Sequence, residues 1–278
     1  MAEVCNCPVR IAFSCIFLAV VVVVAGCGSR GGYYRDDWPP RGVSKSDVEG
    51  IPDAVPKQEP LSETGNRPYK ALGKKYYPMK SALGYSERGV ASWYGKKFHG
   101  ARTSSGEKYD MLAMTAAHRT LPLPTYVKVR GLQNGKSVIV KVNDRGPFLH
   151  NRLIDLSYAA AYKLGVVSTG TGLVEVTTVT PASYQQQASY TIGAPVSARS
   201  VSRPKLFVQY GAFTVKSNAQ DLQRRLSSHG FNPVIEQGIH NGGDIYRVRA
   251  GPYSRVSEID QITARSRQIG FETKIIIE

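Results

Sequence analysis

Several features that would assign a chain to other classes of protein are missing from these 278 residues. No cysteine occurs after Cys27, so no disulfide can cross-link the folded part. The most apolar run, residues 11–24, is shorter than the ~20 residues that cross a bilayer comfortably. The net charge of +15 is spread along the chain without a dense Lys/Arg run, so we expect no nucleic-acid partner. No tight His/Cys spacing indicates a metal site, and we expect neither a metal nor another cofactor.

The apolar run and the residues after it are typical of an export signal. Its length suits the central region of a signal peptide, although Arg10 against Glu3 leaves the preceding segment without a clear positive charge. The following "VAGC" resembles the lipobox of bacterial lipoproteins, which implies cleavage after residue 26 and lipidation of Cys27. Gly28, rather than Asp, implies the periplasmic face of the outer membrane. The alternative is an uncleaved anchor with an incidental cysteine.

The rest of the chain divides into two periodic segments and two irregular ones. Residues 27–83 are rich in Gly, Pro and charge without a sustained period, so we expect a disordered tether there. Residues 84–180 show short strands, an Asn134-Gly135 hairpin signal and one small helix, which indicates a compact β-barrel. A polar linker, 181–203, follows. Residues 204–278 have the order βαββαβ, which predicts a ferredoxin-like α+β domain.

One candidate for chemistry lies in "KVNDRGPF". Val138, Val140 and Val142 share one face of a predicted strand, and Asp144 continues their row at its end. A carboxyl at the rim of an apolar face is partly desolvated, which raises its pKa and keeps a proton available for donation. Arg145 points the other way. The alternative is that Asp144 only caps the turn made by the following Gly-Pro.

Longer motifs around this strand indicate a family. "GVASWYGKKFHGARTSSGEKYDMLAMTAAHRTLP" and "VIVKVNDRGPFLHNRLIDLSYAAAYKLG" resemble the rare lipoprotein A family of bacterial cell-wall enzymes over residues 86–180. The resemblance implies a six-stranded double-psi β-barrel and a lytic transglycosylase that cleaves peptidoglycan glycan strands. The family's functional positions fall on Glu107, His118 and Asp144.

The chemistry of this reaction suits those residues. The C6 hydroxyl of N-acetylmuramic acid attacks its own C1, so one carboxyl that serves first as acid and then as base can suffice. We assign that role to Asp144, with Glu107 as the other candidate. Glu107 and His118 would orient the sugar, stabilise developing charge or set the pKa of Asp144. Each residue also has an alternative without a catalytic role: Glu107 could be a solvated loop carboxylate, and His118 a structural histidine.

Three further residues are candidates for substrate binding. Trp93 and Tyr94 in "SWYG" either stack on sugar rings in the cleft or fill the core. Arg145 is the third candidate, and its alternative role is structural.

The C-terminal segment resembles the sporulation-related repeat (SPOR) domain in "FVQYGAF", "YRVRAGPY" and "FETKIII". That resemblance implies binding to peptidoglycan glycan stripped of stem peptides, which is enriched at division septa. Strand alternation places four residues on the open face of the sheet, where they would meet the lactyl carboxylates of the glycan: Phe207, Gln209, Arg247 and Arg249. The alternative is a merely solvated basic face.

Together these features predict an outer-membrane-anchored, septal peptidoglycan lytic transglycosylase that acts in cell separation. Its partners would be the membrane, peptide-free glycan strands and division-septum proteins. The alternative is a non-catalytic, expansin-like protein that tethers the outer membrane to septal peptidoglycan. An intact set of Glu107, His118 and Asp144 favours the enzyme.

Overall fold

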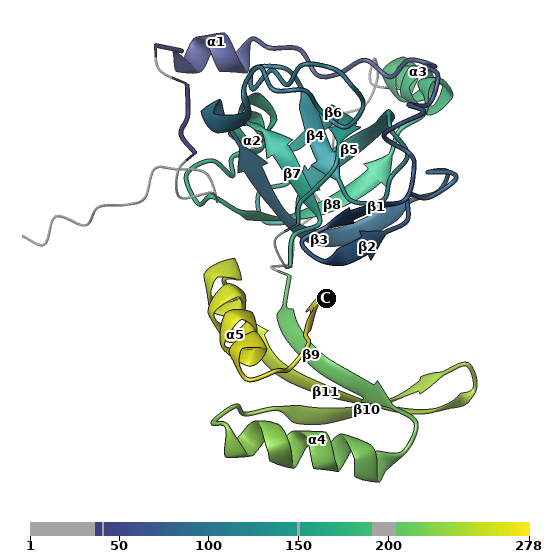
Figure 1. Ribbon diagram of the computed structural model, residues 1–278, viewed down its shortest axis with the longest axis vertical. Helices are drawn as coiled ribbons and strands as arrows, with labels where there is room; N and C mark the ends of the chain where they lie inside the picture. The colour runs from purple at the N-terminus through teal and green to yellow at the C-terminus, as the bar shows by residue number, and fades with distance from the viewer. Residues whose placement is uncertain (1–36, 41, 149–150, 191–203) are drawn as a thin grey trace, which may run out of the picture.

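The structure is a computed structural model that describes residues 37–40, 42–148, 151–190 and 204–278. The predicted signal peptide and Cys27 lie outside these residues. In the described part, no helix has the length and apolar character needed to cross a membrane. Two domains are stacked along the long axis of the molecule, with a barrel at the top and an α+β domain below it (Figure 1).

The first domain is a closed barrel of six strands, as predicted, and its strands lie in the order β3-β7-β4-β6-β5-β8. The neighbours β3 and β7, and likewise β4 and β6, are parallel, whereas the other pairs are antiparallel. The six strands are β3 (Ser86–Tyr94), β4 (Thr115–His118), β5 (Thr125–Gly131), β6 (Ser137–Asp144), β7 (Ile154–Ser157) and β8 (Gly172–Thr178).

Local signals explain how the chain turns within the barrel. Asn134 and Gly135 join β5 to β6, and Gly135 adopts φ +70°, which suits a residue without a Cβ. Helix α2 (Tyr158–Leu164) starts at Ser157, whose side chain accepts from the Ala160 N–H, and ends at Gly165 in the left-handed region. A 3₁₀ turn, η1 (Lys96–Phe98), follows β3.

The prediction of a disordered tether over 27–83 is wrong for the residues that the structure describes. We call residues 42–83 the N-terminal strap, because they run along the barrel and bind it. The strap contains helix α1 (Lys45–Glu49) and the hairpin β1 (Tyr69–Ala71) and β2 (Lys74–Tyr76). Val48 is buried in the barrel core cluster, and the Asp53 carboxylate accepts from the Ile139 N–H at 3.0 Å. Hydrogen bonds and apolar burial together hold this segment on the barrel, although its sequence shows no apolar period.

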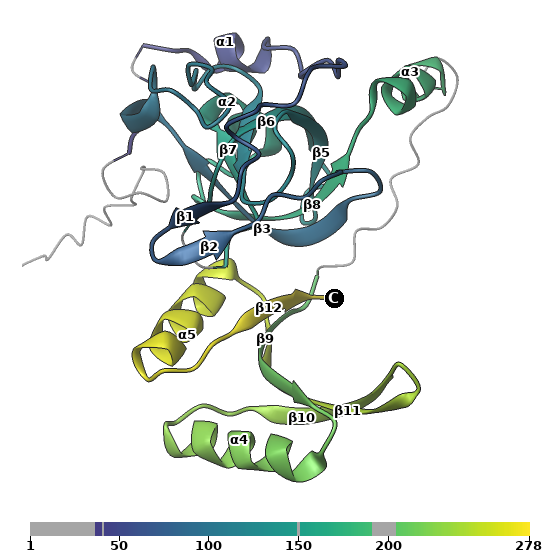
Figure 2. The ribbon, with the colours of Figure 1, turned by 45° about the vertical axis from the view of Figure 1, so that its right-hand side comes forward.

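The second domain is the predicted βαββαβ fold. Its antiparallel sheet has the order β10-β11-β9-β12. Helices α4 and α5 pack on one face, where Val208 and Val248 are fully buried against them. The elements are β9 (Leu206–Phe213), α4 (Lys216–Ser228), β10 (Val234–His240), β11 (Gly243–Tyr253), α5 (Val256–Gln268) and β12 (Lys274–Ile277). Helix α3 (Pro181–Tyr190) occupies the start of the predicted linker and projects from the barrel (Figure 2).

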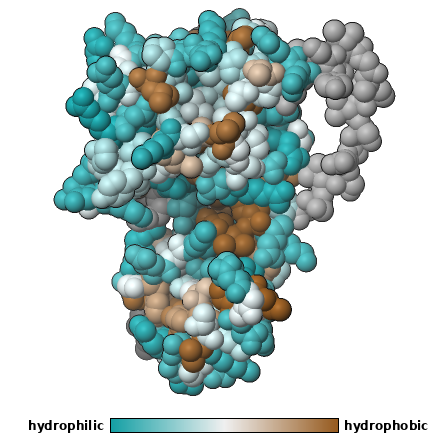
Figure 3. Space-filling view, turned by 90° about the vertical axis from the view of Figure 1, so that its right-hand side faces the viewer, coloured by the Kyte–Doolittle hydropathy of each residue, from teal (hydrophilic) through white to brown (hydrophobic). Residues whose placement is uncertain are grey.

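The two domains share a packed interface. Val90, Leu132 and Leu173 of the barrel belong to one buried cluster with residues of β9 and α5, including Leu206 and Ile259. Arg152 of the barrel forms an ion pair of 3.1 Å with Asp260 of α5, and its side chain is fully buried. Figure 3 shows apolar side chains gathered at the level where the domains meet. The interface combines apolar burial with a specific ionic contact.

Candidate active site

Asp144 ends β6, but the predicted alternation is interrupted just before it. A register shift against β4 skips Asn143, which is buried, and pairs Asp144 with Ala117. Val138, Val140 and Val142 are buried, and the Asp144 side chain is half-buried at the rim. Its Oδ1 accepts three hydrogen bonds, from the Ser104 N–H (2.8 Å), the Ser104 hydroxyl (2.7 Å) and the Arg145 N–H (2.7 Å). Among the described residues, Oδ2 has no hydrogen-bond partner. One oxygen therefore fixes the carboxyl, and the other is available to a ligand.

Glu107 lies on the same turn that holds Asp144. The turn, residues 103–107, is closed by the Thr103 N–H on the Glu107 carbonyl at 2.8 Å. It is attached to β6 by the Ser105 N–H, which donates to the Asn143 carbonyl at 3.1 Å. Since the adjacent residue, Ser104, binds Asp144, the turn brings the two predicted carboxylates to one end of the barrel.

The Glu107 carboxylate is held by two donors from β6. Lys141 Nζ donates to Oε1 at 2.7 Å, and Asn143 Nδ2 donates to Oε2 at 2.7 Å. Lys141 also pairs with Glu59 of the strap at 2.7 Å. Burial alone would lower the pKa of Lys141, but its hydrogen bonds to Glu107 and Glu59 raise it above the ordinary value. Lys141 is thus a cation that fixes Glu107, and the sequence reasoning missed it together with Ser104, Asn143 and Glu59.

His118 is placed differently from the two carboxylates. Its side chain is buried, and its Nδ1 accepts from the Thr120 N–H (3.2 Å) and the Leu121 N–H (2.9 Å). Its Nε2 lies 3.1 Å from the Tyr85 hydroxyl. Burial, with the nearby charges of Arg119 and Arg145, lowers the pKa of His118 to about 3. The ring is therefore neutral at pH 7, and Nε2 carries its proton.

This geometry does not fit a histidine that touches the sugar or its developing charge. With an exposed fraction of 3%, the ring has no free surface to offer a substrate. Its carbonyl oxygen accepts from Arg145 Nη1 at 3.1 Å, and its ring orders the turn whose Leu121 carbonyl also binds Arg145. His118 therefore acts on Asp144 only indirectly: it orders the carbonyls that bind Arg145, the residue next to Asp144. We call it a positioning residue for this reason.

The predicted substrate-binding residues of the barrel are structural. Arg145 donates hydrogen bonds to four protein groups: the carbonyls of Gly65, His118 and Leu121 and the side chain of Asn66. Trp93 is 0% exposed and packs edge-on against Tyr158, and Tyr94 is buried against Tyr109. Stacking of a sugar on Trp93 or Tyr94 is therefore excluded by their burial, and the alternative, core packing, holds.

The open face of the second domain carries the four residues predicted for it, in two different states. Arg249 is 8% exposed and is paired with Glu236 and Glu278, each at 2.7 Å, above the Phe207 ring and beside Gln209. Its charge is already balanced within the sheet. Arg247 lies against Gly238, and no hydrogen bond or ion pair engages it among the described residues. Arg247 is thus the more available cation of the two.

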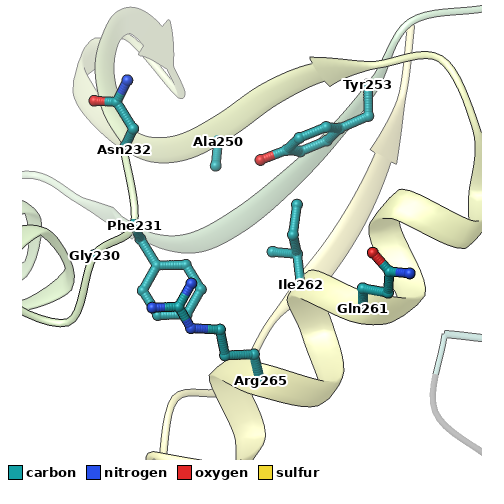
Figure 4. A pocket seen from close by; sticks show the side chains of 8 residues that line it. All are labelled: Gly230, Phe231, Asn232, Ala250, Tyr253, Gln261, Ile262 and Arg265. Atoms are coloured by element: carbon teal, nitrogen blue, oxygen red, sulfur yellow. The ribbon is translucent and has the colours of Figure 1, made fainter. Parts of the chain in front are cut away.

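The opposite, helix-covered face of this domain is hollowed. A cleft of about 310 Å³ lies between α5, the turn after α4 and β11. Figure 4 shows Tyr253, Ile262 and the Arg265 side chain around it, with the Phe231 ring beneath the guanidinium. It is separate from the face of Arg247 and Arg249, because Ala250 alternates with Arg249 along the strand.

Comparison with known proteins follows the same two domains. A domain family described as lytic transglycolase matches residues 86–177, and the SPOR domain family matches residues 202–271. A Vibrio cholerae protein named endolytic peptidoglycan transglycosylase RlpA is 41% identical over 271 residues, which cover 94% of this chain and 95% of that protein. The chain belongs to the RlpA family. Proteins of the same name in Pseudomonas aeruginosa PAO1 (39% identical, covering 86% of this chain and 83% of that protein) and Neisseria meningitidis MC58 (41%, covering 77% and 85%) match as well.

Two solved structures match parts of the chain. The RlpA SPOR domain from Pseudomonas aeruginosa is 25% identical and covers 26% of this chain and 96% of that structure, with a TM-score of 0.24. An expansin from Clavibacter michiganensis is 16% identical and covers 62% of this chain and 81% of that structure, with a TM-score of 0.27.

Proposed function

We propose that this protein is an endolytic peptidoglycan lytic transglycosylase that cleaves the β-1,4 bond between N-acetylmuramic acid and N-acetylglucosamine. The observation that carries the proposal is the turn of residues 103–107, which carries Glu107 and binds Asp144 Oδ1 through Ser104. Oδ2 of Asp144 has no partner among the described residues. Membership of a family whose members are named for this reaction supports it.

The roles follow from the hydrogen bonds. Asp144 Oδ2, which has no protein partner in the described structure, carries the proton that goes to the leaving oxygen as the C1–O4 bond breaks. The C6 hydroxyl of the same muramic acid then forms the C1–O6 bond, and its proton returns to Asp144, so the acid is regenerated. Both Glu107 oxygens are already occupied by donors, which suits a fixed negative charge near the oxocarbenium-like centre.

The second domain would hold the enzyme on its substrate. Among the described residues, Arg247 has no ion-pair partner and shares the open face of the sheet with Arg249. A free cation on this face suits a glycan whose lactyl carboxylates are exposed once stem peptides are removed. We therefore include peptide-free septal glycan as the preferred substrate, cell separation as the process, and the outer membrane, through a lipid on Cys27, as the location. Division-septum proteins remain expected partners.

The test is the chemistry of the product. Purified wall sacculi and peptide-free glycan strands are incubated with the soluble protein, and the released fragments are analysed by mass spectrometry. Attack by the C6 hydroxyl leaves 1,6-anhydro-muramic ends, whereas attack by water leaves reducing ends that are one water mass heavier.

The matched variants are Asp144→Asn, which keeps the acceptor for all three donors on Oδ1, and Glu107→Gln. Loss of the general acid should lower turnover by about 10²–10⁴-fold with the fold intact. Reducing ends would make the protein a hydrolase, and a fully active Asp144→Asn variant would remove the assigned acid. Binding without any cleavage by the wild type would favour the tethering alternative.

A further inference from the structure

Three aromatic rings lie together beside the segment that follows Asp144. Tyr69 and Tyr76 face each other across the β1–β2 hairpin, with ring centroids 5.2 Å apart and planes at 16°. The Phe148 ring is 6.0 Å from Tyr69 and 5.7 Å from Tyr76. All three are half-buried, so each keeps part of its ring surface in solvent, unlike Trp93 in the barrel core. We call these three rings the aromatic cluster.

The hairpin is fixed at the Asp144 end of the barrel. The Tyr69 hydroxyl donates to the Arg119 carbonyl at 2.9 Å, and the Met79 N–H donates to the Thr120 carbonyl at 2.7 Å. The guanidinium carbon of Arg145, the residue after Asp144, lies 5.9 Å from the Tyr69 ring centre. Burial raises the pKa of Tyr69 to about 12, and the charge of Asp144 is among the contributions that raise it. Tyr69 is thus an uncharged phenol at neutral pH.

The β1–β2 hairpin also carries several lysines whose positive charges do not stabilise it. Lys70 and Lys75 are directly opposite each other and exposed, and neither forms an ion pair with any residue that the structure describes. Like charges at a directly opposed pair destabilise a hairpin. Lys74 adds a third ammonium group, 6.0 Å from the Tyr76 ring centre. The surface therefore combines flat apolar faces with unbalanced positive charge.

We propose that the aromatic cluster is a sugar-binding subsite, on which a ring of the glycan strand stacks while its neighbour occupies the cleft at Asp144. The C–H face of a pyranose packs on a flat aromatic ring, and the hairpin lysines attract the carboxylates of successive muramic acids. The hairpin lies outside residues 86–177, which match the lytic transglycolase family. The strap would therefore add a subsite to a catalytic domain whose family match does not include the strap. This inference rests on the proposed function for the identity of the ligand.

The experiment compares substitutions at two adjacent tyrosines in the full chain. Tyr76→Leu keeps an apolar side chain against Tyr69 but removes the flat face, and Tyr76→Phe retains that face. Tyr77→Leu is the matched control, because Tyr77 is 65% exposed and outside the aromatic cluster. On peptide-free glycan strands, Tyr76→Leu should lower kcat/KM about three- to tenfold, mainly through KM. Tyr76→Phe and Tyr77→Leu should match the wild type, with equal melting temperatures for all four proteins.

Two outcomes would overturn the subsite: wild-type kcat/KM for Tyr76→Leu, or an equal fall for Tyr77→Leu. If the wild type releases no product, the proposed function fails, and affinity then decides the subsite. Binding of a muramic-acid-containing tetrasaccharide to the full chain, measured in an Arg247→Ala background, should weaken for Tyr76→Leu and not for Tyr77→Leu. Equal affinities of the Tyr76→Leu and Tyr77→Leu variants for the tetrasaccharide would also contradict the subsite.

Discussion

Arg145→Lys tests whether the arginine next to the candidate acid binds substrate or holds the site together. The guanidinium donates five hydrogen bonds, two of them to the Gly65 carbonyl and one each to the Asn66 side chain and the His118 and Leu121 carbonyls. These acceptors belong to the strap and to the turn after β4. Arg145 therefore joins two segments that are far apart in the sequence to the end of β6.

The size of the effect follows from counting donors. An ammonium group has three donors, so Arg145→Lys loses at least two of the five hydrogen bonds. Each hydrogen bond of a charged group contributes about 1.5–3 kcal/mol, and partial access of water to this side chain reduces the loss. We expect the free energy of unfolding to fall by about 2–4 kcal/mol. For a domain of this size, that corresponds to a fall in Tm of about 5–15 °C.

The assay is thermal unfolding of the full chain followed by circular dichroism, together with turnover of glycan strands at a temperature below both transitions. Arg119→Lys is the control, because the Arg119 side chain makes one long hydrogen bond to the described residues, 3.4 Å to the Pro147 carbonyl. Its Tm should change little. An unchanged Tm for Arg145→Lys with a raised KM would refute the structural assignment and restore a substrate-binding role.

Three further predictions follow from the described groups. The folded-state pKa of His118 is about 3 against an ordinary value of 6.5, so the unfolded chain binds a proton that the folded chain excludes. The free energy of unfolding should therefore fall as the pH drops from 6.5 toward 3. Urea unfolding of His118→Gln should show a shallower fall than that of the wild type, and parallel pH profiles of the two proteins would contradict this. In the second domain, Arg247→Ala should weaken capture by amidase-treated sacculi at unchanged Tm, whereas Arg249→Ala should lower Tm because Glu236 and Glu278 lose their partner; unweakened capture by Arg247→Ala would argue against the open face. Palmitate should label the wild type and not Cys27→Ala, and equal labelling would remove the proposed anchor.

Strand alternation predicted much of what positions the site. The buried row of valines along β6, the turn at Asn134-Gly135 and the two faces of the second sheet are local patterns that a single strand or turn contains. The end of β6 at Asp144 agrees with the strand prediction, whereas the register shift between Val142 and Asp144 could not be predicted from the alternation. Its partner, Ser104, could be noticed only as a residue of a Ser-Ser-Gly turn, because the contact joins positions 40 residues apart.

The errors share a physical cause. The strap has no apolar period, so its sequence does not predict a folded segment. It is nevertheless held on the barrel by hydrogen bonds and by the burial of Val48 in the barrel core. His118 and Arg145 stand in motifs with functional residues, but only the tertiary structure shows that one is enclosed and that the other binds backbone carbonyls. Burial is a property of the assembled fold, and the sequence around a polar residue does not determine it.

A buried contact of Asp37, which precedes the strap, would limit the distance between the barrel and a membrane to which Cys27 was anchored. Asp37 is fully buried and accepts from the Gly95 and Lys97 N–H groups, so the chain is attached to the barrel from that residue on. Only ten peptide units separate it from Cys27, which gives a maximum span of about 35 Å. A tether that stayed free as far as residue 84 would span up to about 200 Å. If Cys27 carries the lipid, the barrel is confined to a thin layer at the membrane surface, and only glycan strands that approach this layer come within its range.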